Sequence, residues 1–232
     1  MQQPTAYLIN ALLNLQLEGS KCGTSTPASL FPKVDPKCNA ERLIDILDKA
    51  STTYPEAELD QTASPLVTLI RKVYDLAPEM VKKYMQSRML PSVEDRKKPL
   101  GRSDSLSSRL LNFSSSPMVA SLRESVSSLL FELSDKDSSQ FVENVGYGFA
   151  SGFLMTHNLP MPENAMAAFS TEDGGNGKGK RINPITGQLL DTEEDVEMPE
   201  MTEEEKEREA EKLFVLFERY AVFTFDASDQ FR

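Results

Sequence analysis

The sequence predicts an all-α fold in which short helices stack as a partial armadillo- or HEAT-like helical-repeat superhelix. Apolar residues recur every three or four positions in one segment after another, which is the period of an amphipathic helix. No segment shows sustained alternation of apolar and polar residues, so no strand is expected. The helical segments form two sets, residues 40–90 and 106–158, each close to the roughly 40–50 residues of one such repeat. A compact bundle is the alternative, although short helices without long heptads favour the array.

The first helix is expected within residues 1–39, ahead of a linker that contains glycine, serine and proline. Leu8, Leu12 and Leu15 follow one another at helical spacing and therefore share one side of this helix.

Proline residues divide the next stretch, residues 40–90, into three helices. Pro55 ends the second helix of the chain, because the residue before a proline is driven out of the helical region. Ser64 and Pro65 are expected to start the third helix, since proline suits the first turn of a helix. Pro78 then separates the third helix from the fourth.

A polar, basic loop, residues 91–103, precedes the second set of helices at 106–158, and the two sets make up a repeat region of residues 40–160. The segment 146–152 is rich in glycine, but it lacks the preceding strand and the following lysine of a phosphate-binding loop. We interpret it as the end of one helix and the start of the next. The clearest apolar stripe in the chain belongs to this second set and comprises Val119, Leu122, Val126, Leu129, Leu130 and Leu133.

The character of the sequence changes after residue 160. Residues 161–201 are rich in glycine and lysine and then in acidic residues, and are expected to form a flexible linker. Thr202 and Glu205 have the spacing of a capping box, so residues 202–221 are expected to form an amphipathic C-terminal helix whose second half is apolar. Residues 222–232 follow as a tail.

Charge and composition exclude several classes of function. The formal net charge of the 232 residues is −11, and residues 191–211 hold twelve acidic against two basic side chains, so the rest is nearly neutral. Without a dominant basic face, nucleic acid is not expected as a partner. Cys22 and Cys38 lack the spacing of a metal site, and no metal or cofactor is expected. The single histidine, His157, has no nucleophile marked as its neighbour, so covalent catalysis is not expected.

The sequence also bears on the compartment. No apolar run is long enough to span a bilayer, and the N-terminal residues do not have the charge pattern of a signal peptide. We therefore expect a cytoplasmic, monomeric protein that does not insert into membranes.

Two short segments match the pattern of an acid-directed phosphorylation site. Ser170 and Thr192 each precede an acidic residue three positions later. A phosphate at either position could bind a basic patch and order the segment. Matches of this kind are frequent by chance, which is the alternative interpretation.

Four blocks of sequence together resemble the synembryn family, and its fungal form in particular. Residues 129–154 carry the strongest likeness, followed by the motif Asn-Pro-Ile-Thr-Gly at 183–187 and the acidic block at 201–213. The fourth block is residues 89–102. Their order and spacing match the family's C-terminal half, from about residue 40 to residue 220; the family's N-terminal repeats have no counterpart here, and the residues after 220 do not resemble the family's end.

The resemblance implies an armadillo-like superhelix and a defined partner, the α subunit of a heterotrimeric G protein in its GDP-bound or nucleotide-free form. It implies guanine nucleotide exchange and folding-chaperone activity toward that subunit, with the subunit's C-terminal helix held in the concave face. Such a factor needs no acid, base or nucleophile, because binding the open subunit more tightly than the closed one weakens nucleotide affinity by the same factor. It also implies recruitment to the cell cortex through the partner. The alternative is a protein-binding scaffold without exchange activity.

The resemblance also assigns residues to the partner-binding surface. By position, the fourth helix, which carries Lys82 and Lys83, contributes basic contacts in the family. Lys136 falls in a loop near the same face. The final helix follows the Asn-Pro-Ile-Thr-Gly motif. The residues expected to bind the partner are Lys82, Lys83, Arg88, Lys136, Leu213, Phe214 and Phe217.

Overall fold

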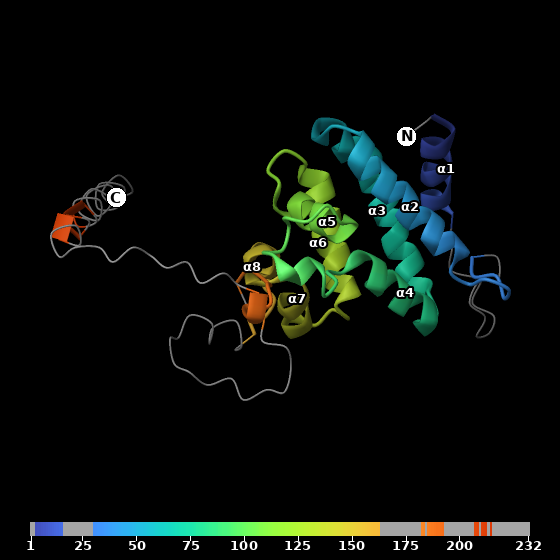
Figure 1. Ribbon diagram of the computed structural model, residues 1–232. Helices are drawn as coiled ribbons and strands as arrows, with labels where there is room; N and C mark the ends of the chain where they lie inside the picture. Colours follow the sequence, from blue (N-terminus) through green and yellow to red (C-terminus); the bar gives the residue numbers. More distant parts are fainter. Residues whose placement is uncertain are drawn as a thin grey trace, which may run out of the picture. The chain divides into compact units, whose positions relative to one another are not determined.

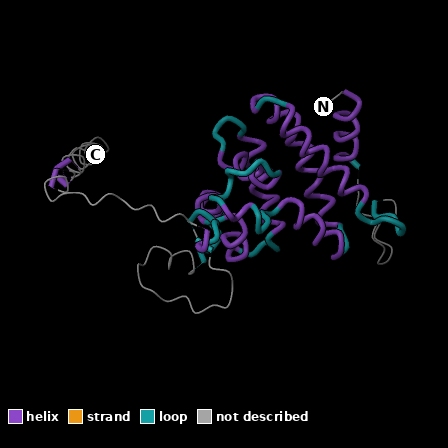
Figure 2. Tube along the Cα trace, in the orientation of Figure 1, coloured by secondary structure: helices purple, strands orange, loops and turns teal. Residues whose placement is uncertain are grey.

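The computed structural model describes residues 3–15, 30–162, 182–183, 185–192, 207–208, 210–212 and 214. These residues form helices joined by loops (Figure 2), with a single isolated antiparallel bridge between Ile182 and Leu189 as the extended pairing among them. The prediction of an all-α fold is therefore confirmed. The chain divides into two units, residues 1–193 and 194–232, and each is considered by itself.

The first unit holds eight α-helices within its described residues (Figure 1). Two short 3-10 helices are Asp95–Lys97 (η1) and Leu190–Thr192 (η2). The α-helices are Gln3–Asn14 (α1), Cys38–Thr53 (α2), Glu56–Leu76 (α3), Glu79–Met89 (α4), Leu106–Ser115 (α5), Ala120–Leu133 (α6), Ser138–Val145 (α7) and Tyr147–Thr156 (α8).

Proline residues and capping side chains set the limits of several helices. Pro55 and Pro78 hold extended backbone immediately before α3 and α4, with ψ angles of 151° and 154°. Ser105 accepts a hydrogen bond from the backbone amide of Ser108 at the start of α5, and Asp137 caps α7 in the same way. The separation of the helices at Pro55 and Pro78 follows the sequence-based prediction.

The prediction that Ser64 and Pro65 start the third helix was wrong. The helix begins at Glu56 and continues through Pro65 to Leu76. Proline inside a helix removes one backbone hydrogen bond and strains the preceding turn. Leu59, which lies before the proline, is only 2% exposed, so burial of this first half against the core offsets the defect.

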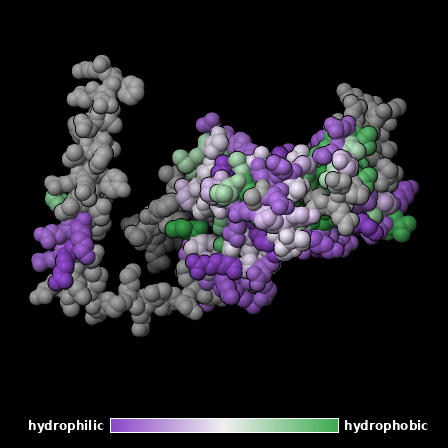
Figure 3. Space-filling view, turned by 90° about the horizontal axis from the view of Figure 1, so that it is seen from above, coloured by the Kyte–Doolittle hydropathy of each residue, from purple (hydrophilic) through white to green (hydrophobic). Residues whose placement is uncertain are grey.

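Helix α1 packs through Ile9, not through the face that Leu8, Leu12 and Leu15 share. Ile9 faces the core and is 3% exposed, with Leu13 packed beside it, whereas Leu8, Leu12 and Leu15 are exposed. Both faces of α1 carry apolar residues, so helical spacing alone could not choose between them. Figure 3 shows apolar side chains on the surface at the right-hand end of the first unit, where α1 lies.

The helices stack as two successive sets. Helix α2 packs on α3 in the first set, α5 packs on α6 in the second, and α3 and α6 pack against each other across the sets. Arg71 of α3 and Glu132 of α6 form an ion pair with an N–O distance of 2.6 Å at this junction. Asp60 of α3 also accepts a hydrogen bond of 2.8 Å from the backbone amide of Leu122 in α6. Equivalent helices of the two sets therefore lie side by side, as the helical-repeat prediction requires.

Three phenylalanine rings join the last helices of the array. Phe131 of α6, Phe141 of α7 and Phe153 of α8 have ring centroids 5.4–5.7 Å apart, in tilted and edge-to-face arrangements. Such aromatic contacts add about 0.5–1.5 kcal/mol per pair to the free energy gained from burial. This cluster fixes α7 and α8 on the end of the second set.

Candidate partner-binding surface

Helix α4 carries three of the residues expected to bind a partner. Its inward face buries Val81, Met85 and Met89. The remaining faces therefore present its basic residues toward solvent or toward neighbouring helices.

Lys82 and Lys136 line the same surface pocket, although 54 residues separate them in the sequence. The pocket has a volume of about 210 Å³ and lies between α3, α4 and the turn that joins α6 to α7. The Lys82 ammonium lies 5.5 Å from the centre of the Tyr74 ring, close enough for a cation–π contact. The other lining residues are Asp75, Glu132 and Asp135.

A small hydrogen-bond network holds Tyr74, one of the residues that line this pocket. The Gln86 side-chain amide donates to the Tyr74 hydroxyl at 3.1 Å and to the carbonyl of Leu133 at 2.9 Å, which ties α4 to α3 and α6. Burial, together with the negative charge of Asp135, raises the pKa of Tyr74 to about 12. The hydrogen bond from Gln86 holds the Tyr74 hydroxyl, and the Tyr74 ring lies beneath the Lys82 ammonium.

The turn that presents Lys136 has an unusual backbone. Asp135 and Lys136 have φ angles of 55° and 58°, a left-handed conformation that few residues other than glycine adopt. Their amides donate to the carbonyls of Glu132 and Phe131 at 3.1 Å, which closes the end of α6. Positions with this kind of local strain are frequent at functional sites.

The pocket contains both signs of charge. Arg71 binds the Glu132 carboxylate through two hydrogen bonds of 2.6 and 3.0 Å, which neutralises that acid. Two ammonium groups, from Lys82 and Lys136, and two carboxylates, from Asp75 and Asp135, remain around the pocket. The surface is therefore a mixed-charge pocket, not a basic patch.

Arg88 and Lys83 lie apart from this pocket. The Arg88 guanidinium binds Asp45 of α2 at 3.2 Å and the Tyr84 hydroxyl at 3.1 Å, so it faces the α2 side of α4. Lys83 lies 3.8 Å from Glu79, and both side chains are more than 70% exposed. A pair this exposed contributes about 0–1 kcal/mol.

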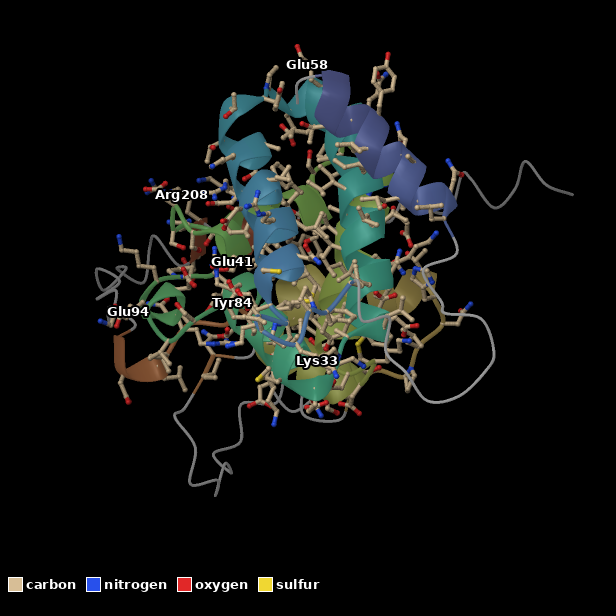
Figure 4. The ribbon with its side chains drawn as sticks, turned by 90° about the vertical axis from the view of Figure 1, so that its right-hand side faces the viewer. Lys33, Glu41, Glu58, Tyr84, Glu94 and Arg208 are labelled. Carbon is tan, nitrogen blue, oxygen red and sulfur yellow. The ribbon has the colours of Figure 1, made fainter. Side chains whose placement is uncertain are left out.

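Tyr84 marks the contact between α2 and α4. Figure 4 shows Tyr84 close to Glu41 of α2. Burial raises the pKa of Tyr84, and the charge of Arg88 opposes this rise. Of the four basic residues predicted to bind a partner, the structure thus brings Lys82 and Lys136 together, leaves Lys83 in solvent and engages Arg88 in an internal ion pair.

The remaining predicted residues belong mostly to parts of the chain outside the described residues. Leu213, Phe217 and Ser170 lie there. Phe214 is helical and 64% exposed, and its described neighbours in the second unit, 207–208 and 210–212, are helical and exposed as well. Thr192 ends η2, and its side chain is not among the described ones.

Arg96 has a structural role that the sequence did not predict. Its side chain is 8% exposed, although it lies in a loop of polar and basic residues. The guanidinium donates to the carbonyls of Glu143 at 3.1 Å, Asn144 at 2.9 Å and Gly187 at 3.1 Å. Burial lowers the pKa of Arg96, and the charge of Glu143 opposes this effect. A cation at the carbonyl end of a helix is favoured by the helix dipole, and Arg96 occupies that position at α7.

Residues 182–183 and 185–192 lie against the array around Arg96, and we call these residues together with Arg96 the clasp. The Leu189 amide donates to the Arg96 carbonyl at 2.8 Å, and the Leu100 amide donates to the Thr186 carbonyl at 3.1 Å. The Gly148 amide at the start of α8 donates to the carbonyl of residue 185 at 3.3 Å. The clasp therefore connects the 91–103 loop, α7 and α8 with a segment distant in sequence.

The clasp requires glycine at position 187. Gly187 has a φ angle of +67°, and a Cβ atom there would lie 2.3 Å from Cδ1 of Leu100. Asn183 closes the same turn by accepting hydrogen bonds from the amides of Ile185 and Thr186. The residues Asn-Pro and Gly could have predicted a turn, but not the surface on which it packs.

Asp95, beside Arg96, organises the loop at the base of the clasp. Its carboxylate accepts hydrogen bonds from the amide and hydroxyl of Ser92, at 2.9 and 2.8 Å, and from the Ser103 hydroxyl at 2.7 Å. Burial opposes ionisation here, but hydrogen bonds from Ser105, Ser103 and Ser92 outweigh it and hold the pKa of Asp95 well below its usual range.

Two further properties concern the described residues alone. They contain no group of three or more His, Cys, Asp or Glu side chains placed to hold a metal ion. None of their helices is both long and apolar enough to cross a membrane.

A family model supplies the deciding comparison. The family described as guanine nucleotide exchange factor synembryn matches residues 1–221. The chain belongs to the synembryn family. The resemblance inferred from four blocks of sequence is therefore confirmed.

Similar curated proteins carry the names of chaperones. A synembryn-like chaperone of Schizosaccharomyces pombe is 31% identical over 172 residues, which cover 70% of this chain and 32% of that protein. Chaperone Ric-8A of Xenopus tropicalis is 26% identical over 227 residues, 92% of this chain and 40% of that protein. Chaperone Ric-8 of Drosophila pseudoobscura is 26% identical over 199 residues, 83% and 35% respectively. This synembryn chain thus spans 32–40% of the length of these relatives, and no solved structure matches it.

Three of the four blocks that carry the synembryn resemblance meet in the clasp. Arg96 and Leu100 come from the block 89–102, Glu143 and Asn144 come from the block 129–154, and Gly187 belongs to the Asn-Pro-Ile-Thr-Gly motif. The blocks that look separate in the sequence therefore form one structural feature of this synembryn chain.

Proposed function

We propose that this synembryn chain binds the α subunit of a heterotrimeric G protein in its GDP-bound or nucleotide-free form and promotes release of GDP. The match over residues 1–221 to a family described as a guanine nucleotide exchange factor is the observation that carries this proposal. A factor that binds the nucleotide-free subunit more tightly than the loaded one lowers nucleotide affinity by the same ratio. No covalent step is needed, so the chain acts as a binding protein and not as an enzyme.

The chaperone function follows from the same preference. A protein that holds the incompletely folded subunit shields its apolar surface until nucleotide binding stabilises the fold. The names of the relatives, chaperones Ric-8 and Ric-8A, support this part of the proposal. We further propose that the chain is a monomer in the cytoplasm and that its partner recruits it to the cell cortex.

We place part of the contact at the mixed-charge pocket. Lys82 and Lys136 enter it from two different elements, and no ion pair with a carboxylate is recorded for either lysine among the described residues. An acidic side chain of the partner could therefore be bound by both ammonium groups. Phe214, and with it Leu213 and Phe217 of the same expected helix, would supply an apolar contact from the second unit.

The first experiment measures GDP release from a purified α subunit with and without this chain. We expect faster release, and binding to the nucleotide-free subunit but not to the GTP-loaded one. Binding that is indifferent to nucleotide would support the alternative, a protein-binding scaffold without exchange activity. The chain spans at most two-fifths of these relatives, which is the observation that favours this alternative.

The second experiment tests the pocket. Replacing Lys82 and Lys136 together by Glu should weaken binding by roughly 10- to 100-fold, because two attractive contacts, together worth about 1.4–2.8 kcal/mol, become repulsive. Replacing Lys33 and Lys49 together by Glu is the matched control, since it reverses two charges at exposed positions outside the pocket. Equal affinity of the double variant and the control, measured by calorimetry, would remove the pocket from the interface.

A further inference from the structure

We propose that a second pocket, between α5, α6 and α8, binds a small phosphorylated polyol such as a sugar monophosphate. Helix α5 lies beside both α6 and α8 (Figure 1), and the pocket opens between the three helices with a volume of about 400 Å³. This volume is typical of small-molecule sites in proteins. The pocket shares no lining residue with the mixed-charge pocket, so the inference does not depend on the proposed function.

Small residues of α8 form one wall of this pocket. Gly148, Gly152 and Thr156 line it and follow one another at intervals of four residues, so they share one side of the helix. A Cβ atom at Gly152 would meet no heavy atom within 4 Å in the described part of the chain. The backbone of α8 is therefore uncovered there, and a ligand can approach it closely.

A buried hydroxyl group without a protein partner faces the same pocket. Ser127 of α6 lines the pocket and is 7% exposed. Its side chain forms no hydrogen bond among the described residues, although buried polar groups normally have one. No fully enclosed polar side-chain atom in the described part of the chain lacks a partner, so the Ser127 oxygen reaches the space of the pocket. Burying an unpaired hydroxyl group costs free energy, and a ligand that pairs with it removes that cost.

Arg123 adds a positive charge one turn before Ser127 on the same side of α6. It forms no ion pair among the described residues, and its hydrogen bond to the Ser116 carbonyl is long, at 3.5 Å. The guanidinium and the Ser127 hydroxyl are therefore both available as donors. A guanidinium binds two oxygens of a phosphate side by side, and a hydroxyl group can donate to a third.

Other polar groups of the pocket are placed to accept hydrogen bonds. The hydroxyls of Ser114 and Thr156 donate to carbonyl groups of their own helices at 2.7 and 2.8 Å, so their oxygens remain as acceptors. His157 binds one carboxylate oxygen of Glu124 at 3.0 Å, and the other oxygen accepts no hydrogen bond from the described residues. Hydroxyl groups of a ligand satisfy such acceptors. A molecule with one phosphate and several hydroxyl groups therefore matches both the donors and the acceptors.

Calorimetric titration of the full chain with four ligands tests the assignment. The ligands are glucose 6-phosphate, inorganic phosphate, glucose and phosphoethanolamine. Glucose 6-phosphate should bind at least about tenfold more tightly than each of the others, because it alone pairs with both the donors and the acceptors. Tighter binding of phosphoethanolamine would show that the acceptors hold an ammonium group. Equal binding of inorganic phosphate would show that they take no part. Either result, or no binding of glucose 6-phosphate, would overturn the inference.

Two substitutions locate the ligand in the pocket. Arg123→Gln should weaken binding of glucose 6-phosphate by roughly 10- to 100-fold, because it removes hydrogen bonds from a charged donor. Gly152→Leu should abolish binding, because its side chain would extend into the open space beside α8 at a helical position where a Cβ atom meets no neighbour among the described residues. Wild-type affinity of the Gly152→Leu variant would show that the ligand binds elsewhere.

Ser127→Ala separates ligand binding from folding. It should weaken binding of glucose 6-phosphate by about tenfold, yet it should not lower the midpoint of thermal unfolding of the free chain, because the hydroxyl has no protein partner to lose. Ser125→Ala is the matched control, since it makes the same change on the same helix outside the pocket. Equal affinity of the two variants would overturn the inference, and so would a lower midpoint for Ser127→Ala than for Ser125→Ala.

Discussion

At one end of the array, α1 directs Tyr7, Leu8 and Leu12 into solvent, whereas at the other end the clasp covers α7 and α8 with hydrogen-bonded backbone. The two ends lie on opposite sides of the first unit (Figure 1). Helix α1 contains no charged residue, while the clasp is built around a buried guanidinium. The α7–α8 end also exposes apolar side chains, namely Met155, Ile185 and Leu190, but a hydrogen-bonded segment lies against its helices.

The difference shows how a repeat array can be closed without another repeat. The clasp covers the last helices with a short turn. Its Arg96 side chain donates hydrogen bonds to two carbonyl groups at the end of α7, which have no partner within the helix. The α1 end has the opposite property, since its exposed leucines form a surface suited to packing.

The largest expected effect is a loss of stability at the α7–α8 end of the array. Phe141→Ala removes a side chain that is 1% exposed and lies among Phe131 and Phe153, so we expect a loss of about 3–5 kcal/mol in the free energy of unfolding. Urea denaturation at neutral pH measures this. Ile9→Val at the α1 end is the comparison and should lose only about 0.5–1.5 kcal/mol. A smaller loss for Phe141→Ala than for Ile9→Val would reverse the comparison.

The next largest effect is a loss of stability at low pH when Asp95 is protonated. The pKa of Asp95 is lower in the folded chain than in the unfolded chain, so its stabilising contribution is complete above about pH 4 and is lost as the pH falls through its folded value. Asp95→Asn should cost about 1–2 kcal/mol at pH 7, and the difference from the wild type should shrink as the pH is lowered from 5 to 2. Thermal unfolding across this range is the measurement.

Helix α1 provides the contrast, because residues 3–14 contain no carboxyl or imidazole group. Substitutions there should change stability by the same amount at pH 5 and pH 2. A constant difference between wild type and Asp95→Asn over the same range would show that hydrogen bonds to Asp95 do not favour its ionised form.

The smallest expected effect on stability concerns the exposed leucines of α1, at the other end of the array. Replacing Leu8 and Leu12 by Ser should alter the free energy of unfolding by no more than about 0.5 kcal/mol per site, since both side chains are already exposed. The same variant should raise the concentration at which the chain stays in solution, because it removes an apolar surface. Light scattering during concentration tests this, and a large loss of stability would mean that these leucines are packed.

The helical spacing of apolar residues predicted the buried face of α6 correctly. The stripe from Val119 to Leu133 is buried throughout, because α6 and its N-cap residue Val119 carry all of its members into the core between neighbouring helices. The start of α3 was mispredicted because packing of its first half on the core outweighs the preference of proline for a first turn. The packed face of α1 could not be predicted from spacing, since apolar residues lie on more than one side of that helix.

The candidate site divides in the same way. Charge and resemblance placed Lys82 and Lys136 near one another, and the pocket brings them together. Arg96 could not be recognised, because its acceptors are backbone carbonyls 47, 48 and 91 residues away, and a carbonyl group carries no sequence signal. Arg88 was assigned to the same surface as Lys82, but its position on α4 turns it toward Asp45.

The mixed-charge pocket has one more consequence. The carboxylates of Asp75 and Asp135 line the same pocket as the two lysines. An acidic group of a ligand is therefore attracted only where it lies nearer the ammonium groups than the carboxylates. Such a pocket selects a ligand by the placement of its charged groups and not by its total charge.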